Sequence, residues 1–473
     1  MTINSDYGNM RVLFTVPPTH SAVTDYGAIL TSHVHNRRVN KFLSASYPIP
    51  SWGLSWIKEN CPTVEVLDMP KWSGLKRELR KGVDILGISF YTYQVPDVIR
   101  LVELARKYGV KEIWGGNYGT QTPGIEIYFD RIIKGNGEAE VYRLLYGKEL
   151  EEVRHPTVVQ KWKLSGVIGN LIHLGNFNWS HSGVIWTIKG CYFKCDFCVS
   201  PSFIDHTRHK TPVNELERVL DQYVELKLKT VSIMDLDFLM DKRFSKKVMD
   251  MLHERNLRWT CMTRVDHIQG RIKELREKGC EIVFIGVENL NANTLVEHNK
   301  YTKHQKESLQ DLFSELTRNK MGYYLFYMLG FESDTYESLK EQIDYLSSLH
   351  ATFYQFQIVT PLPGSKMFND YRTRIINWNW ADWNCNTLVW KHPHITPKEM
   401  EDILVYAKRK TSLSKILFGM IKRGALDDAF NGDSILSTLL KQAFSFFSLL
   451  KRLLLRVDLR QKEPTEESCV KHG

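Results

Sequence analysis

Three features that mark exported or membrane-spanning proteins are missing from this sequence of 473 residues. Its first residues, MTINSDYGNMRVLF, lack the basic start and long apolar stretch of a secretory signal peptide. No run of about 18 apolar residues, the length that spans a bilayer, occurs in it. Cysteine is scarce, and most of the 8 cysteines are too scattered for the paired framework of a secreted scaffold. We therefore expect a cytoplasmic protein with reduced thiols.

The composition is that of an ordinary globular protein, with 43% hydrophobic and 25% charged residues. A chain of this length exceeds one typical core, so two or three domains are expected. The net charge of +9 is uneven, because eleven Lys and Arg face only four Asp between positions 408 and 460. Most of the basic excess therefore lies in the tail.

Short apolar runs alternate with a helical pattern along the first 150 residues. The runs are rich in β-branched residues and end in turn residues; they cover 11–16, 64–67, 84–90, 111–116 and 130–135. Between the third and fourth, VPDVIRLVELARKYG spaces its apolar positions as an amphipathic helix does. Buried strands separated by helices indicate an α/β domain with a doubly wound parallel sheet over residues 1–150.

After a polar connector at 151–180, six further β/α units follow. Their predicted strands cover 183–189, 230–237, 258–263, 281–288, 323–330 and 353–361. This series predicts a partial TIM barrel over residues 181–370, with its chemistry at the carboxyl ends of the strands. A mostly helical region follows at 371–473.

The stretch GCYFKCDFC places Cys191, Cys195 and Cys198 directly after the first barrel strand. Inert buried thiols rarely cluster this tightly, so a metal is expected. A structural zinc site would need a fourth ligand, such as His206 or His209. An iron-sulfur cluster with four irons would instead leave one iron open to a substrate or cofactor.

This motif, on a loop after the first strand of a six-unit barrel, resembles the cluster motif of the radical S-adenosylmethionine (SAM) enzymes. The resemblance includes the aromatic Phe197 before the last cysteine. It implies a [4Fe-4S] cluster held by Cys191, Cys195 and Cys198, whose open iron is chelated by SAM. Reduction of such a cluster cleaves SAM to a 5'-deoxyadenosyl radical, with electrons from a flavodoxin- or ferredoxin-type partner.

Other strand ends are similar to cofactor-binding segments of that family. Glu288, in GVENLN, would accept hydrogen bonds from the ribose of SAM, although a strand-end glutamate also commonly pairs with a lysine. Arg264 would bind the SAM carboxylate, or else form a structural salt bridge. Gly330, in MLGFESDT, would give the backbone room beside adenine. Asp235 and Asp237 would line the substrate site or cap the next helix.

One branch of the family carries a cobalamin-binding domain before the barrel, and residues 10–150 resemble it in the order and spacing of their motifs. The Asp-x-His-x-x-Gly loop that ligates cobalt in many such domains is absent. Either cobalamin binds without a histidine ligand, or the fold has lost the cofactor. The glycine-rich turns at Gly115, Gly116, Gly135 and Gly137 favour binding slightly, although such a sheet needs tight turns without a ligand as well.

The resemblance implies an enzyme that functionalises an unactivated carbon of a small-molecule or lipid-like substrate. With cobalamin we expect C-methylation; without it, radical cyclisation, rearrangement or carbon-carbon coupling. An iron-sulfur redox sensor or binding protein is the alternative from another class. A tRNA methylthiotransferase is not favoured, because the first domain has only Cys61 and a second cluster needs more. Cys385 either approaches the site or is simply buried.

The segment 434–460 is apolar but interrupted by Lys and Arg. It predicts a basic amphipathic helix that either lies on an anionic membrane surface or packs its apolar side on the barrel. A peripheral membrane contact is therefore one expectation, whereas nucleic acid is not an expected partner, because no aromatic and basic interleaving accompanies the charge.

Overall fold

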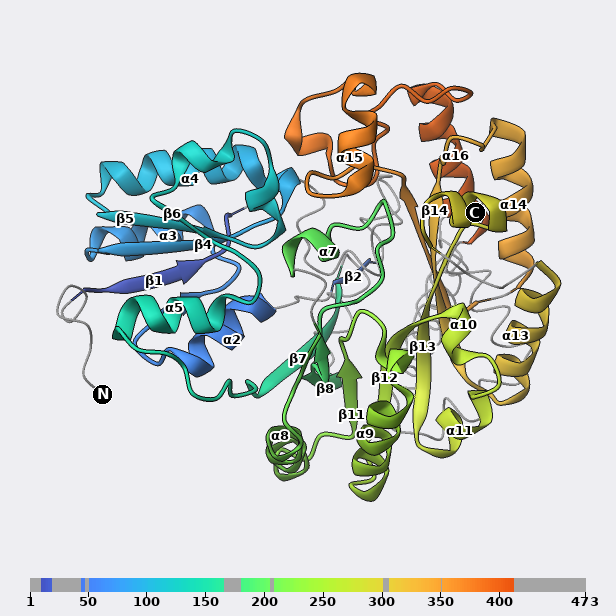
Figure 1. Ribbon diagram of the computed structural model, residues 1–473, viewed down its shortest axis with the longest axis horizontal. Coiled ribbons are helices and arrows are strands. Elements are labelled where there is room, and N and C mark those ends of the chain that lie inside the picture. Colours follow the sequence, from blue (N-terminus) through green and yellow to red (C-terminus); the bar gives the residue numbers. More distant parts are fainter. Residues whose placement is uncertain are drawn as a thin grey trace, which may run out of the picture.

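The computed structural model describes residues 10–18, 44–46, 51–165, 180–204, 208–300, 306–349 and 351–411. Figure 1 shows two α/β bodies side by side, one built from the first 150 residues and one from the barrel segment. The carboxyl-terminal elements α15 (Lys366–Tyr371) and α16 (Pro397–Lys410) lie over one end of the barrel (Figure 1). The predicted tail helix at 434–460 lies outside the described residues.

The first body is a five-stranded parallel sheet in the order β3-β1-β4-β5-β6. Its strands are β1 (Val12–Thr15), β3 (Glu65–Leu67), β4 (Ile85–Ser89), β5 (Glu112–Gly116) and β6 (Arg131–Ile133). Helices α3 (Trp72–Arg80) and α4 (Val95–Lys107) bury leucines and valines against one face. Helices α2 (Trp52–Asn60) and α5 (Gly137–Tyr146) do so on the other. The predicted doubly wound parallel sheet is confirmed.

The second body contains an eight-stranded sheet in the order β15-β14-β13-β12-β11-β8-β7-β2. Its six parallel strands are β8 (Ser180–Ile185), β11 (Thr230–Ile233), β12 (Arg258–Arg264), β13 (Cys280–Glu288), β14 (Gly322–Leu329) and β15 (Phe353–Ile358). Helices α8 (Val213–Glu225), α9 (Lys242–Glu254), α11 (Ile272–Glu277), α13 (Lys306–Arg318) and α14 (Tyr336–Ser348) cover the outside (Figure 1). The six predicted β/α units of a partial barrel are therefore present.

Two strands extend this sheet in a way that the sequence did not predict. The segment expected as a polar connector contains β7 (Val158–Ser165), which runs antiparallel beside β8. Strand β2 (Ser44–Ser46), from the segment assigned to the first domain, pairs with β7 at the sheet edge. The first 150 residues thus contribute to both sheets, and the predicted division at residues 150 and 180 does not follow the strand pairing.

In the described part of the predicted helical region, up to residue 411, an irregular segment precedes the helix α16, and the rest of that prediction lies outside the described residues. Residues 372–396 contain only two short 3-10 turns, Arg372–Arg374 and Trp380–Asp382, before α16 begins. Trp378, Trp380 and Trp383 pack on one another, and Trp380 also contacts the core of the first body. Among the described residues no helix is long and apolar enough to cross a membrane.

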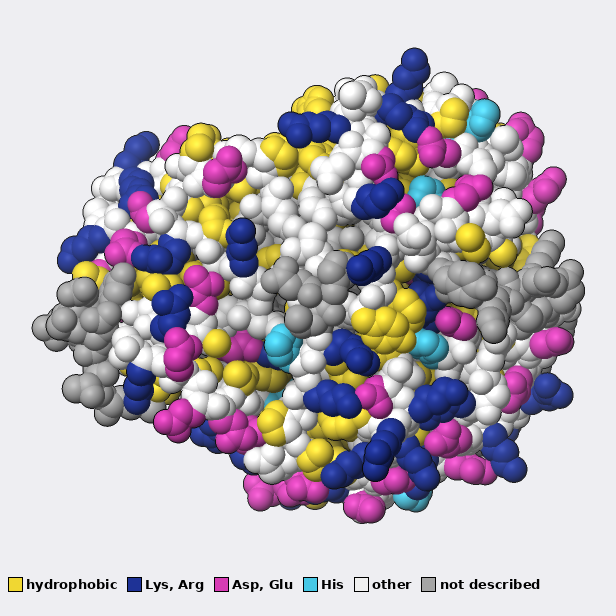
Figure 2. Space-filling model, viewed as in Figure 1, with side chains coloured by type: hydrophobic (Ala, Val, Ile, Leu, Met, Phe, Trp, Pro, Cys, Tyr) yellow, Lys and Arg dark blue, Asp and Glu magenta, His cyan; other side chains and the backbone are white. Residues whose placement is uncertain are grey.

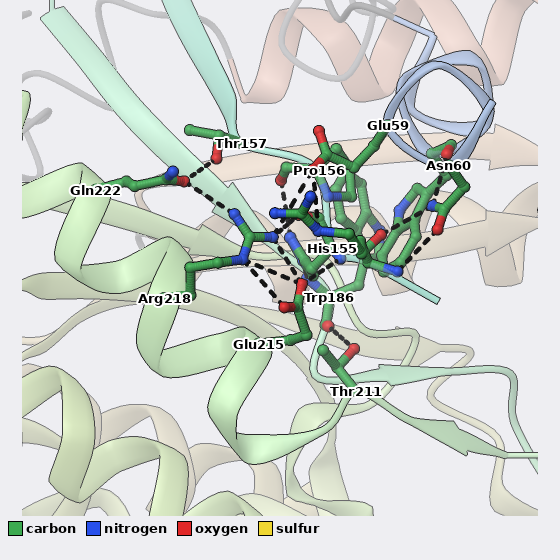
Figure 3. A network of polar contacts seen from close by, with 12 residues as sticks. Glu59, Asn60, His155, Pro156, Thr157, Trp186, Thr211, Glu215, Arg218 and Gln222 are labelled. Atoms are coloured by element: carbon green, nitrogen blue, oxygen red, sulfur yellow. Dashed lines mark hydrogen bonds and ion pairs between the residues drawn. The ribbon is translucent and has the colours of Figure 1, made fainter. Parts of the chain in front are cut away.

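One of the contacts between the bodies is a buried polar network, drawn in Figure 3. We call it the histidine joint; its residues are Trp56, Asn60, His155, Trp186, Glu215 and Arg218. The imidazole of His155 is fully buried, its Nδ1–H donates to the carbonyl of Pro156 (2.8 Å), and its Nε2 accepts from the backbone N–H of Trp186 (3.0 Å). Burial lowers the pKa of His155 to about 3, so the ring is neutral.

Charged groups surround this imidazole without leaving a polar group unpaired within the joint. The guanidinium of Arg218 donates to the carboxylate of Glu215 and to the carbonyl of His155, both at 2.6 Å. Asn60, at the end of α2, exchanges two hydrogen bonds with the backbone of Arg154. The joint therefore ties α2, the connector and α8 together in one satisfied network (Figure 3).

Candidate active site

The three cysteines lie on the irregular segment between β9 (Ile188–Lys189) and α7 (Ser200–Phe203). Gly190 starts this segment with φ at 100°, a conformation that residues with a side chain rarely adopt. The backbone N–H of Cys198 donates to the carbonyl of Cys195 (3.0 Å), which folds the segment into a turn. All three thiols are free and partly accessible.

Burial raises the pKa of Cys191 to about 11, and it also raises the pKa values of Cys195 and Cys198. Negative charge on Cys195 or Cys198 would raise the pKa of Cys191 further, so the three side chains lie near one another. Three partly buried thiolates are therefore unfavourable without positive charge between them. Bound iron supplies that charge, which makes the donor set suitable for a metal cluster.

No group of three or more His, Cys, Asp or Glu side chains, within the described ranges, converges closely enough to hold a single metal ion. His209 is exposed on β10 (His209–Lys210), and His206 lies outside those ranges. This arrangement does not support the zinc alternative, which needs four ligands around one point. In a cluster each thiolate bonds a different iron, so the sulfurs need not converge.

Side chains from three elements hold the cysteine segment. The carboxylate of Asp196 accepts hydrogen bonds from Asn299 (2.7 Å) and Lys366 (3.1 Å). Phe197 packs edge-on against Phe331, with ring centroids 6.0 Å apart. The guanidinium of Arg264 lies 4.0 Å from the ring centroid of Phe193. The segment is therefore fixed at several points before any cofactor binds.

Arg264 lies beside the cysteines, as the sequence predicted for a SAM contact, and it influences the pKa of Cys195. The side chain is 8% exposed, and its Nε is 3.0 Å from a carboxylate oxygen of Asp266. The structural salt bridge considered as its alternative is therefore present. Contact with the SAM carboxylate stays a prediction.

Glu288 ends β13 in a left-handed conformation, with φ at 64°, where the pairing with β14 is irregular. Its carboxylate is 2.7 Å from the Nζ of Lys300, which also donates to the carbonyl of Gly286 (3.0 Å). The pairing with a lysine is thus the arrangement observed, and a ribose contact stays a prediction. Lys300 was missed by the sequence analysis, although it lowers the pKa of Cys195 and therefore lies near the site.

Gly330 follows β14 with φ at 87°. A Cβ added here would lie 2.4 Å from the Cε of Met400 on α16, so the close approach that requires glycine is that of a helix. Its expected place beside adenine stays a prediction.

The two aspartates at the second barrel strand also hold the site. Asp235 accepts hydrogen bonds from the hydroxyl and backbone N–H of Thr187 and from the backbone N–H of Ile188, two residues before the motif. Asp237 accepts from Thr263 and His267. The prediction that they cap the next helix is wrong, since Asp241 caps α9.

The concave face of the large sheet carries apolar side chains. Phe284, Tyr324 and Phe326 stack with centroid distances of 5.1 to 6.3 Å, and Met262 lies on the same face. Residues that alternate with these point outward into the helix-covered core. Gln160 on β7 is fully buried, and neither end of its amide has a partner among the described residues. The interior face therefore combines aromatic rings and methionine on β12 to β14 with hydroxyl and amide side chains on the flanking strands, among them Ser182, Ser232 and Gln355.

A second contact between the two bodies lies beside the cysteines, and we call it the tyrosine joint. Its residues are Tyr118, Gln121, Ser200, Ser202 and Phe203. The hydroxyl of Tyr118, after β5, is 3.2 Å from the Oγ of Ser200, and its ring is 4.6 Å from that of Phe203. Ser202 donates to the side chain of Gln121 (2.8 Å). Figure 1 shows α7, which carries both serines, between the two bodies.

Comparison with known proteins agrees with this geometry. Residues 187–346 match the model of the radical SAM superfamily. An uncharacterized methyltransferase of Pyrococcus horikoshii is 23% identical over 84% of this chain and 91% of its own length. Bacteriochlorophyllide d C-8(2)-methyltransferase of Chlorobaculum tepidum is 23% identical over 45% of this chain and half of its own length.

The fold is also found among solved structures. The methyltransferase TsrM of Kitasatospora setae, solved with cobalamin and a [4Fe-4S] cluster bound, superposes with a TM-score of 0.61. The superposition covers 86% of this chain and 90% of TsrM at 13% sequence identity. The chain contains a radical SAM domain and is an enzyme; enzymes with this domain use a [4Fe-4S] cluster and SAM. The fold of the chain is similar to that of TsrM over most of its length.

Proposed function

We propose that this protein is a cobalamin-dependent radical SAM methyltransferase that methylates a carbon atom of a small apolar molecule. The observation that carries the proposal is the contact between the first sheet and the segment that follows the three cysteines. The carboxyl edge of the first sheet, at Tyr118, contacts Ser200 and Phe203 directly after the cysteine motif. A methyl donor held at that edge would face the chemistry at the cysteines. The methyltransferases among the relatives support the same function.

In this proposal Cys191, Cys195 and Cys198 hold the cluster, because three thiolates so close together need the positive charge of iron. When bound, the cluster and SAM would together supply the radical chemistry that removes a hydrogen atom from a carbon. Arg264 and Lys300 contribute positive charge beside Cys195, where the carboxylate of SAM would need it. The interaction of Glu288 with Lys300 fixes the carboxylate that would meet the ribose.

Three residues at the carboxyl edge of the first sheet support a place for cobalamin there. Among the described residues, a Cβ on Gly116 would meet no atom closer than 4.0 Å. Tyr91 exposes 43% of its surface at the same edge, where its ring could contact a large cofactor. Asn117 adopts φ at 73° without being glycine. When bound, cobalamin would supply the methyl group.

The other glycines named in the sequence argument have packing reasons of their own. A Cβ on Gly115 would meet the ring of Phe129 at 3.0 Å, and one on Gly137 would meet Ile133 at the same distance. A Cβ on Gly135 would lie 3.3 Å from the carbonyl oxygen of Phe203. Segments 86–94, 114–121 and 133–138 at this edge contain no histidine. The proposed binding therefore does without a histidine ligand from these segments.

The substrate class follows from the concave face. Stacked aromatic rings and methionine favour a substrate with a large apolar part. One relative is named as a methyltransferase of bacteriochlorophyllide d. On the face drawn in Figure 2, Lys and Arg are interspersed with Asp and Glu, so it offers no continuous basic stripe for nucleic acid.

The cluster is tested by anaerobic reconstitution with iron and sulfide, followed by iron analysis and measurement of 5'-deoxyadenosine after addition of SAM and dithionite. Cys195→Ala is expected to abolish SAM cleavage and to lower the bound iron. Cys61→Ala, which removes a buried thiol of the first body, is the matched control and is expected to retain both. A wild-type protein that binds iron but never forms 5'-deoxyadenosine would favour the redox-sensor alternative.

Cobalamin is tested separately by reconstitution with hydroxocobalamin and absorption spectra after gel filtration. Gly116→Val adds a branched side chain at this edge, where a Cβ meets no described atom closer than 4.0 Å, so it is expected to lower bound cobalamin at least tenfold and leave the iron content unchanged. A wild-type protein that takes up no cobalamin would refute methylation and favour radical cyclisation, rearrangement or carbon-carbon coupling.

A further inference from the structure

One buried polar side chain of the barrel has no hydrogen-bond partner in the part of the chain that the structure describes. Gln160 on β7 is fully buried, and both the oxygen and the nitrogen of its amide are unpaired there. Buried amides are nearly always paired, because an unpaired amide loses its hydrogen bonds to water without replacing them. Gln355 on β15 shows the usual arrangement, since its amide oxygen accepts from the hydroxyl of Tyr324 (3.1 Å). The amide of Gln160 therefore needs another explanation.

The pairing of β7 with β8 places Gln160 on the concave face of the large sheet. Gln160 lies opposite Ser182 in this antiparallel pair, and opposed residues point to the same side. A Cβ on the next residue, Gly183, would lie 2.5 Å from the ring of Tyr223 on α8, so Gly183 faces the helices outside. Ser182 faces inward, because successive residues of a strand alternate, and its hydroxyl is 3.3 Å from that of Ser232 on β11. Gln160 shares this inner face.

The side chains next to Gln160 towards the carboxyl end of β8 are apolar. The next pair on the inner face, Val158 and Val184, packs with Trp56 and Trp186 in one buried cluster. Aromatic rings of β13 and β14 line the same face further around the barrel. The amide thus lies in surroundings of low dielectric, where a hydrogen bond between neutral groups is strong and an unpaired amide is costly.

We propose that the amide of Gln160 binds an uncharged carboxamide or lactam group on an otherwise apolar substrate. A glutamine amide has N–H donors and a carbonyl acceptor side by side, and such a group pairs with both at once. The aromatic rings would hold the apolar part of the molecule.

The depth of Gln160 also sets a minimum length for the substrate. Its opposite residue, Ser182, lies three residues before the end of β8, so the bound group would lie about 10 Å below the carboxyl edge. A substrate that reaches from Gln160 to the cysteine segment is at least this long. The inference rests on the proposed function and names the specificity-determining residue for its substrate.

The binding of two aromatic probes to the full-length protein, measured by isothermal titration calorimetry, tests this role. Naphthalene-2-carboxamide carries the proposed group, and methyl naphthalene-2-carboxylate has the same ring system without an N–H donor. The wild-type protein is expected to bind the amide at least tenfold more tightly, because the ester leaves the oxygen of Gln160 unpaired. Gln160→Met keeps the length of the side chain but removes both polar groups, and it is expected to bind the two probes equally.

Gln310→Met is the matched control, because Gln310 is exposed on the outer helix α13, and it is expected to keep the preference of the wild type. Urea unfolding without a probe gives a second measurement. Gln160→Met should be at least as stable as the wild type, since it removes an unpaired amide.

A clear loss of stability in Gln160→Met would show that the amide has a structural partner, and it would overturn the inference. Equal affinities of the wild type for amide and ester would do the same. Neither measurement needs a cluster or SAM, so a failure of the proposed function, seen as absent 5'-deoxyadenosine, is distinguishable from a failure of this inference.

Discussion

The histidine joint and the tyrosine joint hold the same two bodies together by different means. In the histidine joint a neutral imidazole, an ion pair and backbone groups satisfy one another inside the protein (Figure 3). The tyrosine joint has aromatic rings and hydroxyl groups, and its Ser200 stands two residues after Cys198. The histidine joint therefore stabilises the contact between the two bodies through buried polar groups, whereas the tyrosine joint places the first sheet next to the cysteine segment.

The largest loss of stability is expected for Arg218→Met. Its removal leaves the carboxylate of Glu215, 10% exposed, with the backbone N–H of His155 as a donor but without its ion pair, and it takes the Arg218 donor from the carbonyl of His155. We expect the free energy of unfolding to fall by about 2–3 kcal/mol, measured by urea unfolding with tryptophan fluorescence at pH 7.5. Arg77→Met, at a side chain that is 73% exposed, should change it little. Equal losses in the two variants would mean that the histidine joint stabilises the protein no more than an exposed side chain does.

Acid should weaken the histidine joint selectively. The pKa of His155 is about 3 in the folded protein and about 6.5 when unfolded, so below pH 6.5 the unfolded state binds more protons. The stability is complete above about pH 6.5 and falls towards pH 3 by about 1.4 kcal/mol per pH unit. Urea unfolding at pH 7.5 and 5.5 measures it. His155→Gln should show a smaller difference between these pH values; an equal difference would contradict the assignment.

The smallest loss of stability is expected at the tyrosine joint, for Phe203→Leu. The leucine keeps most of the apolar volume but loses the aromatic pair with Tyr118, which is worth about 0.5–1.5 kcal/mol. Urea unfolding should therefore show less destabilisation than in Arg218→Met. A variant that destabilises the protein as much as Arg218→Met would contradict the larger stabilising role of the histidine joint.

The sequence predicted the features that depend on residues close together in the chain. Runs of apolar residues predicted both sheets, and the spacing of Cys191, Cys195 and Cys198 predicted the candidate site. Contacts between distant segments left no such pattern. Tyr118 and Ser200 are 82 positions apart, and Lys300 reaches Glu288 from beyond a helix. The local motif therefore revealed the candidate cluster ligands, but not the residues that hold the cysteine segment in place.

Strand β2 has a practical consequence for anyone who would study the barrel alone. A fragment that starts at residue 150 would lose β2 and leave β7 as an open edge, with unpaired backbone groups that invite association between copies. It would also lose Glu138, the ion-pair partner of Lys189 just before the cysteines. A truncated protein that starts at residue 150 would therefore tend to aggregate, whereas point variants of the full chain keep the strand pairing of both sheets.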